Sequence, residues 1–496
     1  VLKHVCLDRH IGNRLLEEID VANIQATVAE INEYFGSNQA SEFNYTFDTD
    51  NVSFEETVAS IASAVFCNAY RRGNVIKLKF ERATEDSTLL FNHRNKLPGT
   101  ETRTVRFGNQ DDNDGVEYEW VDPEDDAIVT LYIPEDKSAV NPKKIESLGV
   151  RNYFQAFSHA WRIWNKIQFQ HVATEFEATQ EADILVLSDR ILVADNTRPG
   201  TQDGEVISQN GLSLELSQEI VFDGGETYTI FIQHIDGSVE SMPVSAGASS
   251  RFVTLSRAPK APLALDDDFY ARALYQIVGN SSKREQAFIM TEKQPQTNFT
   301  SAINAINYDF AYYMNDSLLL WIDGKLEDSS ALEQALTLTG TPAVVSDYTR
   351  GNVIETSASE RFNLPTSFVQ PDSYTKAVWA DNDVTDNQHF LRSVNEGFYL
   401  NYQDKFGASH NGTNLIAPLA YLPGTWRHYV VTYDADTTTM KLFVNGEKVA
   451  ESSTMPQRTK TQLYGPSNYI GRTDDLRLFA RALDEAEVKA LYRKTL

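Results

Sequence analysis

The sequence predicts a multidomain, mainly β protein with an α+β part at its N-terminus. Short runs in residues 184–257 alternate between apolar and polar side chains and are separated by Gly-containing turns. This period-two pattern is typical of antiparallel hairpins, and several hairpins in a row indicate a small barrel or sandwich. A second region of alternating runs fills residues 317–496, whereas helical spacing occurs mainly before residue 170. The 496 residues are enough for about three or four domains of ~100–200 residues each.

The composition narrows the class of protein. Hydrophobic residues make up 41% of the chain and aromatic residues 11%, which is typical of globular rather than disordered proteins. The formal net charge is −26. Because DNA affinity depends on neutralisation of phosphates by Lys and Arg, this charge argues against direct nucleic-acid recognition. The chain begins with Val1 rather than Met, so we expect it to be part of a longer protein.

Motifs for metal-dependent or nucleophilic chemistry are absent from the sequence. Cys6 and Cys67 lie in apolar contexts and are expected to be buried thiols rather than part of a disulfide framework or zinc site. The nine histidines include no HExxH pair, and there is no Walker A loop and no Gly-x-Ser-x-Gly elbow.

Residues 1–105 are expected to form an α+β domain. Helical spacing predicts helices over Leu15–Phe35 and Ser53–Arg72. Ser53 is followed three residues later by Glu56, which is the signature of a capping box at the start of the second helix.

Residues 106–180 are expected to contribute strands and one aromatic helix. The acidic loop Asp111–Gly115 does not fit the EF-hand register, so a solvated hairpin turn is favoured over a calcium loop. Residues 151–170 predict a helix with an aromatic stripe, which would pack either in the core or against another subunit. The stripe consists of Phe154, Phe157, Trp161, Trp164 and Phe169.

Residues 181–300 predict a small antiparallel β-barrel. In one expected strand Leu212, Leu214 and Leu216 point to the same side, and Tyr228 and Ile230 repeat this pattern further on. Residues 301–316 are rich in Asn and Tyr and are expected to connect the barrel to the second all-β domain at 317–496.

Eight passages follow one another in an order that points to a known family. They are RRGNVIKLKF (71–80), VEYEW (116–120), IESLGV (145–150), DRILVAD (189–195), GEVIS (204–208), GETYTIFI (225–232), DGSVE (236–240) and AINAINYDFAY (302–312). Each is only a strand with a turn, but their order and spacing resemble the host-specificity protein J family, the central tail-tip proteins of long-tailed phages. The resemblance covers roughly residues 1–312. The fibronectin-like domains with which that family usually continues are not evident here.

The resemblance implies a structural role at the tail tip of a virion. In that family these domains resemble the baseplate hub, in which three copies form a ring that closes the tail tube and carries receptor-binding parts. The expected partners are therefore two further copies of the chain in a homotrimer, other tail proteins, and a host-cell receptor or glycan. Receptor engagement would trigger DNA ejection. No cofactor is implied.

Residues 317–496 predict a β jelly roll closed by a short helix. The region opens with the strand Leu318–Ile322, contains the hairpin GTWRHYVVTYD–KLFVNGE (424–447), and ends with YIGRTDDLRLFARA (469–482) before a helix capped by Asp484. These passages resemble the laminin-G/concanavalin-like jelly roll. The strand near residue 476 is expected to pair with the opening strand near residue 320 and so seal the sheet edges.

Jelly rolls of this kind often bind glycans, sometimes with calcium, and polar loop residues are the candidate ligand-binding side chains. The acidic segment Asp381–Asn387 could hold a cation through its oxygen atoms, although a polar loop between two strands is the favoured interpretation. Trp321, Trp379, Trp426 and His428 are expected in the core. The candidate binding residues are Asn382, Asp383, Asp386, Asn387, His389, His410, Asn411 and Asn414.

The sequence therefore favours a phage tail-tip hub that ends in a jelly roll and is not an enzyme. The alternative is a bacterial surface or secreted carbohydrate-binding adhesin in which residues 1–312 form a stalk. A polysaccharide depolymerase would need two carboxylates flanking the scissile bond. No Glu-x-Asp-x-x-Glu run occurs in 317–496.

Overall fold

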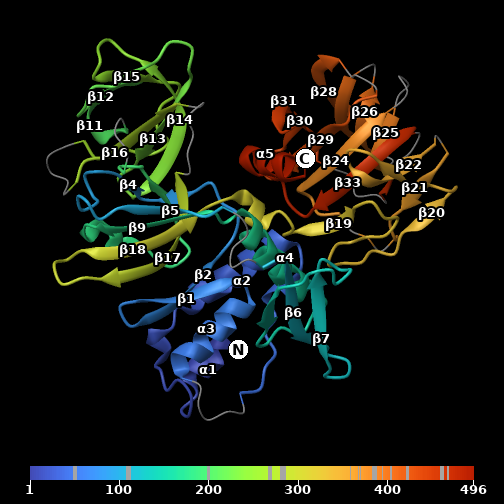
Figure 1. Ribbon diagram of the computed structural model, residues 1–496, viewed down its shortest axis with the longest axis horizontal. Coiled ribbons are helices and arrows are strands. Elements are labelled where there is room, and N and C mark those ends of the chain that lie inside the picture. Colours follow the sequence, from blue (N-terminus) through green and yellow to red (C-terminus); the bar gives the residue numbers. More distant parts are fainter. Residues whose placement is uncertain are drawn as a thin grey trace.

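The computed structural model describes residues 1–47, 53–107, 113–197, 201–265, 271–279, 286–357, 359–366, 368, 370–382, 388–393, 395–402, 405–420, 424–457, 463–465 and 469–495. Within these ranges the chain forms an α/β body, a lobe made of an open sheet and a barrel, and a jelly roll (Figure 1). The predicted fold class, mainly β with an α+β N-terminal part, is confirmed.

The body places four helices around two small sheets. Its elements are α1 (Leu2–Leu7), α2 (Val21–Phe35), α3 (Phe54–Ala64), β1 (Cys67–Arg72), β2 (Val75–Phe80), β6 (Gly115–Val121), β7 (Ile128–Ile133), β8 (Pro142–Glu146) and α4 (Tyr153–Phe169). One core contains buried residues from all four helices and from β1, β2, β6 and β7, and includes Phe35, Phe66 and Phe154.

The start of α3 is as predicted but its end is not. Ser53 Oγ accepts a hydrogen bond from Glu56 N at 3.2 Å, and Glu56 Oε2 accepts one from Ser53 N at 2.8 Å, so the capping box is confirmed. The helix predicted to reach Arg72 ends at Ala64, because Phe66 adopts a left-handed conformation with φ of 58°. The following six residues form β1, which pairs antiparallel with β2.

The acidic segment 111–115 lies only partly within the described residues. Asp114 accepts hydrogen bonds from the backbone N–H groups of Val140 and Asn141, both at 2.7 Å. The carboxylate thus ties the start of β6 to the loop before β8, and these bonds hold its pKa below the usual value. These hydrogen bonds explain the position of the Asp114 carboxylate without a bound cation.

The barrel is confirmed, and it is closed. Its strands are β11 (Gln202–Asn210), β12 (Ser213–Leu216), β13 (Tyr228–Gln233), β14 (Ser238–Ala246), β15 (Phe252–Leu255) and β16 (Leu274–Gly279). They pair in the cyclic order β13, β16, β11, β12, β15, β14 and back to β13. Leu214, Leu216, Tyr228 and Ile230 fill the interior, as the alternation predicts, whereas Leu212 sits outside in a turn.

The barrel is an insertion into an open six-stranded sheet. That sheet has the order β4 (Leu90–Phe91), β10 (Arg190–Val193), β17 (Ala287–Pro295), β18 (Ser301–Asn307), β9 (Val172–Ala178) and β5 (Thr102–Val105). The chain leaves it after β10, builds the barrel and returns at β17. Segment 301–316, expected as a connector, contains β18, which lies between β17 and β9 in this sheet.

Closure bears on assembly, because cyclic pairing removes free strand edges from the six described barrel strands. The short strand β3 (Ser87–Thr88) adds to one end of β14. In the neighbouring open sheet, β5 is an outer strand with mostly exposed residues. The exposed edge therefore belongs to the sheet, not to the barrel.

The jelly roll consists of two sheets and a final helix. The first sheet contains β19 (Leu318–Ile322), β21 (Ala343–Asp347), β22 (Gly351–Thr356), β24 (Tyr374–Asn382), β29 (Arg427–Asp434), β30 (Thr439–Val444), β31 (Glu447–Ser452) and β33 (Gly471–Phe479). The second contains β20 (Thr337–Thr339), β23 (Arg361–Asn363), β25 (Gln388–Ser393), β26 (Glu396–Tyr402), β27 (Lys405–His410), β28 (Thr413–Ala420) and β32 (Tyr464–Gly465). The helix is α5 (Glu485–Lys494).

The predicted seal between the first and last strands of the jelly roll is confirmed. β19 pairs antiparallel with β33, with Leu320 opposite Leu478 and Ile322 opposite Leu476. The core between the two sheets contains Val378, Phe390, Val431 and other large apolar side chains. Asp484 caps α5 and forms a capping box with Glu487.

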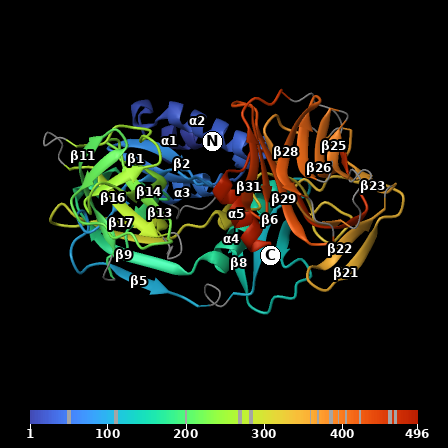
Figure 2. The ribbon, with the colours of Figure 1, turned by 90° about the horizontal axis from the view of Figure 1, so that it is seen from above.

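Part of the aromatic stripe of α4 packs against the jelly roll. Phe157 is buried with Trp321, Val430 and Phe443 on the outer face of the first sheet, and Leu491 of α5 completes the cluster. Seen from above, α4 and α5 lie between the barrel lobe and the jelly roll (Figure 2). The stripe, predicted as core or subunit interface, is divided: Phe154 lies in the core of the body, whereas Phe157 and Trp161 form a seam between two parts of one chain.

Buried charges join the same parts. Arg162 of α4 donates to both carboxylate oxygens of Asp316 at 2.7–3.1 Å, and Tyr34 of α2 donates to Asp316 at 3.2 Å. Arg481, beyond β33, donates to Tyr34 Oη at 3.3 Å and to both oxygens of Glu487. Because breaking such buried pairs is costly, these contacts favour the observed arrangement of the jelly roll on the body.

Candidate functional site

A site that combines acidic, basic and aromatic side chains lies at the rim of the jelly roll. Four segments meet there: the end of β21, the end of β24, the residue before β29 and the start of β33. They contribute Asp347, Asp381, Trp426 and Arg472, which we call the rim site. The antiparallel pairing of β24 with β33 places Asp381 directly opposite Arg472.

Asp347 organises the rim site. Its Oδ1 accepts hydrogen bonds from Thr349 N at 2.8 Å, Thr349 Oγ1 at 2.7 Å and Arg350 N at 3.1 Å. Its Oδ2 accepts from Arg472 at 2.7 Å and from Trp426 Nε1 at 3.3 Å. The bonds from Thr349, followed by those from Trp426 and Arg350, lower the pKa of Asp347 to about 2. The carboxylate is therefore ionised at neutral pH.

Arg472 connects the two carboxylates. One of its terminal nitrogens binds Asp347 and the other binds Asp381. Asp381 is buried, and its Oδ1 has no hydrogen-bond partner among the described residues. A guanidinium held by two carboxylates has a fixed plane, which is a favourable arrangement for directional hydrogen bonds to a ligand.

Aromatic surface lies beside these charges. Trp426 is half-buried, and the guanidinium carbons of Arg350 and Arg472 lie 5.8 and 5.7 Å from its ring centroid. Tyr348, at the tip of the turn that holds Asp347, is fully exposed. An aromatic face bordered by fixed donors and acceptors can bind a polar ring such as a sugar.

The predicted binding residues fall into three groups. Asp383, Asp386 and Asn387 lie outside the described residues. The backbones of Asn382 and His389 belong to β24 and β25, but the structure describes no side-chain contacts for them. The segment that begins at Asp381 nevertheless starts within the rim site.

His410 has a core position. Its ring is fully buried, where Nε2 lies 2.8 Å from Tyr374 Oη and Nδ1 lies 3.2 Å from the carbonyl oxygen of Pro456. A histidine enclosed in this way offers no face to a ligand. The prediction placed it in a loop because it precedes Asn411-Gly412, but it is the last residue of β27.

Asn411 and Asn414 are exposed on the hairpin of β27 and β28, away from the rim site. Asn411 and Gly412 both have positive φ values, 46° and 82°, as a tight two-residue hairpin turn requires. Pairing places this turn at the Ser393 end of β25. Because His389 and Ser393 are four residues apart in a strand, the two predicted groups are separated by about 13 Å. They do not form one site.

The residues expected in the core are mostly found there. Trp321, Trp379 and His428 are buried, but Trp426 lies just before β29 at the rim. Neither ring nitrogen of His428 has a hydrogen-bond partner in the described part of the chain. Burial lowers the pKa of His428 to about 3, so the ring is neutral.

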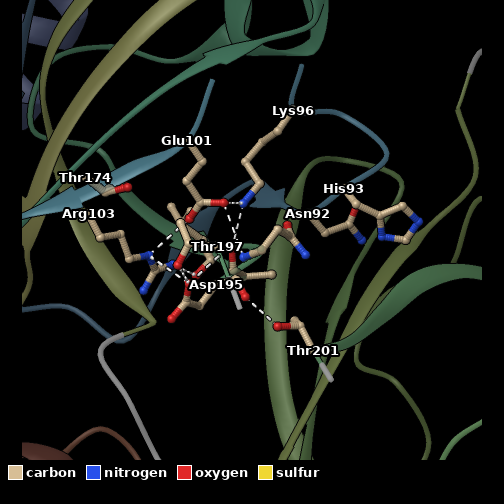
Figure 3. Close-up of polar contacts among 12 residues, drawn as sticks. Asn92, His93, Lys96, Glu101, Arg103, Thr174, Asp195, Thr197 and Thr201 are labelled. Atoms are coloured by element: carbon tan, nitrogen blue, oxygen red, sulfur yellow. Dashed lines mark hydrogen bonds and ion pairs between the residues drawn. The ribbon is translucent and has the colours of Figure 1, made fainter. Parts of the chain in front are cut away.

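A second polar cluster lies where the barrel joins the open sheet (Figure 3). Lys96 and Arg103 both bind Glu101, and Lys96 Nζ also donates to the carbonyl oxygen of Ala194 at 2.6 Å. Arg103 lies 3.7 Å from Asp195. The Lys96, Glu101 and Arg103 side chains are at most 10% exposed. Such buried charges cannot receive a ligand without a rearrangement, so we assign this cluster a structural role.

The described ranges contain no group of three or more His, Cys, Asp or Glu side chains that could hold a metal ion. Likewise, none of their helices has the length and hydropathy needed for a membrane span.

The C-terminal domain matches a known family. A family model described as the Concanavalin A-like lectin/glucanases superfamily matches residues 356–489. The match covers most of the jelly roll at 317–496, so the predicted laminin-G/concanavalin-like jelly-roll domain is confirmed. No curated protein sequence matches the chain.

Solved structures resemble about a third of the chain. The binding domain of Paraclostridial Mosquitocidal Protein 1 is 16% identical, with a TM-score of 0.32 over 36% of this chain and 53% of that one. Domain 4 of AbnA, an extracellular arabinanase from Geobacillus stearothermophilus in complex with arabinotriose, is 17% identical, with a TM-score of 0.31 over 36% and 98%. The binding domain of Botulinum Neurotoxin DC in complex with SialylT is 12% identical, with a TM-score of 0.32 over 37% and 52%. The chain thus spans about half the length of the two toxin domains.

Proposed function

We propose that this chain is a host-attachment component of a phage tail tip, in which a lectin-type jelly roll binds a cell-surface glycan. The hub role is supported by the ordered resemblance of residues 1–312 to the protein J family. The jelly roll would supply the receptor-binding part. On this proposal the protein acts at the virion tail tip as a homotrimer, together with other tail proteins, and works as a binding protein without cofactor or catalysis.

The rim site is the observation that carries the glycan assignment. It combines a half-buried tryptophan, a guanidinium fixed by two carboxylates and an exposed tyrosine on one edge of a lectin-type fold. The Asp347 and Asp381 side chains are only 8% and 4% exposed and orient Arg472, whose side chain is 32% exposed and can donate hydrogen bonds to sugar hydroxyls. The aromatic ring contributes apolar contact area.

The seam would transmit a displacement of the jelly roll to the body. The jelly roll is joined to the body by the aromatic stripe of α4 and by the buried Arg162–Asp316 pair. A force or displacement applied at the rim site would therefore move the body as well, instead of being lost in a flexible linker. This is the property required if receptor engagement is to shift hub subunits and open the path for DNA.

A glycan array probed with the full chain tests the assignment. We expect binding to a restricted set of glycans, weakened at least tenfold by Trp426→Ala and by Arg472→Lys. The lysine keeps the charge but cannot bridge Asp347 and Asp381. The matched control is Phe299→Ala, which removes an aromatic side chain that is 82% exposed on the turn between β17 and β18. Unchanged binding by both rim variants would rule out the rim site.

A further inference from the structure

A pocket lies at the seam between the body and the jelly roll. Its volume is about 450 Å³, and its walls come from β7, α4 and the loop after β19. In Figure 1 α4 lies beside β19, with β6 and β7 below it. Pockets of 300–1,000 Å³ are typical of small-molecule sites. Any ligand held here would contact both parts of the chain.

Aromatic side chains dominate the wall. Three of the six tryptophans line the pocket, namely Trp161, Trp164 and Trp321, together with Tyr132 and Tyr153. The Trp161 and Trp321 rings meet edge to face with centroids 5.2 Å apart. Trp321 Nε1 donates to Asp475 at 2.8 Å, so its ring is fixed, whereas Trp161 and Trp164 are only half-buried. Ring surface is thus left available to the pocket.

The polar lining is acidic. Its charged lining residues are Asp114, Glu135, Asp136, Asp323 and Lys325, and Lys325 Nζ binds Glu135 at 2.8 Å. Asp323 is exposed and makes no hydrogen bond or ion pair with another described residue. The lining therefore offers carboxylate acceptors but no unpaired cation to attract an anion.

We propose that this seam pocket binds a saccharide that carries no negative charge. Its aromatic rings would pack against the apolar faces of the sugar, and its carboxylates would accept hydrogen bonds from hydroxyl or amino groups. Acidic sugars are excluded by repulsion from the carboxylates. The inference rests on the proposed function only in taking a glycan as the ligand class, because the pocket shares no residue with the rim site.

Binding here would strengthen the seam. The ligand would touch Trp161 and Trp164 on α4 and Trp321 and Asp323 on the jelly roll, so it would favour the joined arrangement of the two parts. A ligand at one hundred times its Kd stabilises the state that it binds by about 2.7 kcal/mol. The melting temperature of the full chain should therefore rise with the concentration of a seam-pocket ligand.

The test uses the full chain on an array of neutral, amine-bearing and carboxylated oligosaccharides, followed by titration of intrinsic tryptophan fluorescence. We expect neutral or amine-bearing glycans whose binding falls at least tenfold in Trp164→Ala and at least threefold in the isosteric Asp323→Asn. The control Trp426→Ala should leave these glycans bound, which separates this pocket from the rim site. Far-ultraviolet circular dichroism verifies that each variant is folded.

Several results would overturn the proposal. One is an array on which no uncharged or amine-bearing glycan depends on Trp164 and Asp323. Another is preferential binding of carboxylated glycans at this pocket. A third is fluorescence quenching by a basic peptide such as Lys-Trp-Lys with no response to any sugar, which would assign the pocket to a cationic protein segment. The array could instead contain glycans that depend on Trp164 and Asp323 but none that depends on Trp426. In that case the rim site is wrong and the seam pocket stands.

Discussion

At the scale of single residues, burial determines the protonation state of His428. It lies in the outer layer of the first jelly-roll sheet, next to Trp379 and Tyr492, with ring centroids 5.3 and 6.0 Å away. Burial in this aromatic layer disfavours the imidazolium and lowers the pKa of His428 to about 3. The residue is therefore a neutral packing element.

This burial predicts an acid sensitivity of the jelly roll. Between pH 6.5 and 3 the unfolded chain binds a proton at His428 that the folded chain does not, so stability is complete above pH 6.5 and falls as the pH is lowered. At pH 5 the loss is about 2 kcal/mol. His428→Leu should remove this part of the pH dependence of the jelly-roll melting temperature, measured by calorimetry from pH 7 to pH 5. An unchanged slope in the variant would contradict the account.

Some residue roles could be predicted from the sequence and others could not. The capping boxes of Ser53 and Asp484 were predictable because their partners lie three residues away. The rim site was not, because Asp347, Asp381, Trp426 and Arg472 are brought together only by strand pairing over more than a hundred residues. Trp426 was assigned to the core because it continues an alternating pattern into β29.

At the scale of elements, the insertion of the barrel into the open sheet depends on a buried ion network. Glu101, beside β5, neutralises Lys96 and Arg103, and its side chain is 7% exposed. Burial lowers the pKa of Lys96, although Glu101 opposes this shift. Without that carboxylate, two cations would remain near one another in a region with little water.

We expect Glu101→Gln to destabilise the barrel lobe by about 3–5 kcal/mol, because it leaves buried cations without their main partner. The matched control is Glu205→Gln. Glu205 binds the partly exposed Arg94 at 2.8 Å, and loss of an exposed pair costs about 0–1 kcal/mol. Calorimetric melting of both variants measures the difference, and an equal effect on the lobe would show that the network is not stabilising.

Periodicity predicted the elements better than their pairing. The alternating strands 213–216 and 228–233 form as expected because each covers the barrel interior with every second side chain. The helix predicted over Ser53–Arg72 fails beyond Ala64, because β1 gains hydrogen bonds and packing from β2 that local spacing does not show. Periodicity also predicted the barrel but not its strand order, in which β13 pairs with both β14 and β16.

At the scale of the whole molecule, the jelly roll packs against the body through side chains of α4. The pairing of β19 with β33 was predictable, because the two strands lie at the two ends of the domain. The seam was only half predictable. The aromatic stripe of α4 indicated a packed face, but nothing in its own sequence identified the jelly-roll sheet as the surface that covers it.

The proposed homotrimer depends on contact surfaces between whole molecules. A ring of identical subunits needs two different contact surfaces on each copy, repeated around an axis. The outer strand β5 of the open sheet presents mostly exposed residues, including Val105 at its end, and could contribute one such surface. An adhesin that acts as a single chain would have no need of such a contact.

The mass of the purified full chain in solution, measured by light scattering over a range of concentrations, tests the central claim most directly. The proposed hub predicts a stable species of three times the 55.8 kDa chain mass. A monomer at every concentration, with and without the neighbouring tail proteins, would contradict the ring-forming tail tip and favour the carbohydrate-binding adhesin.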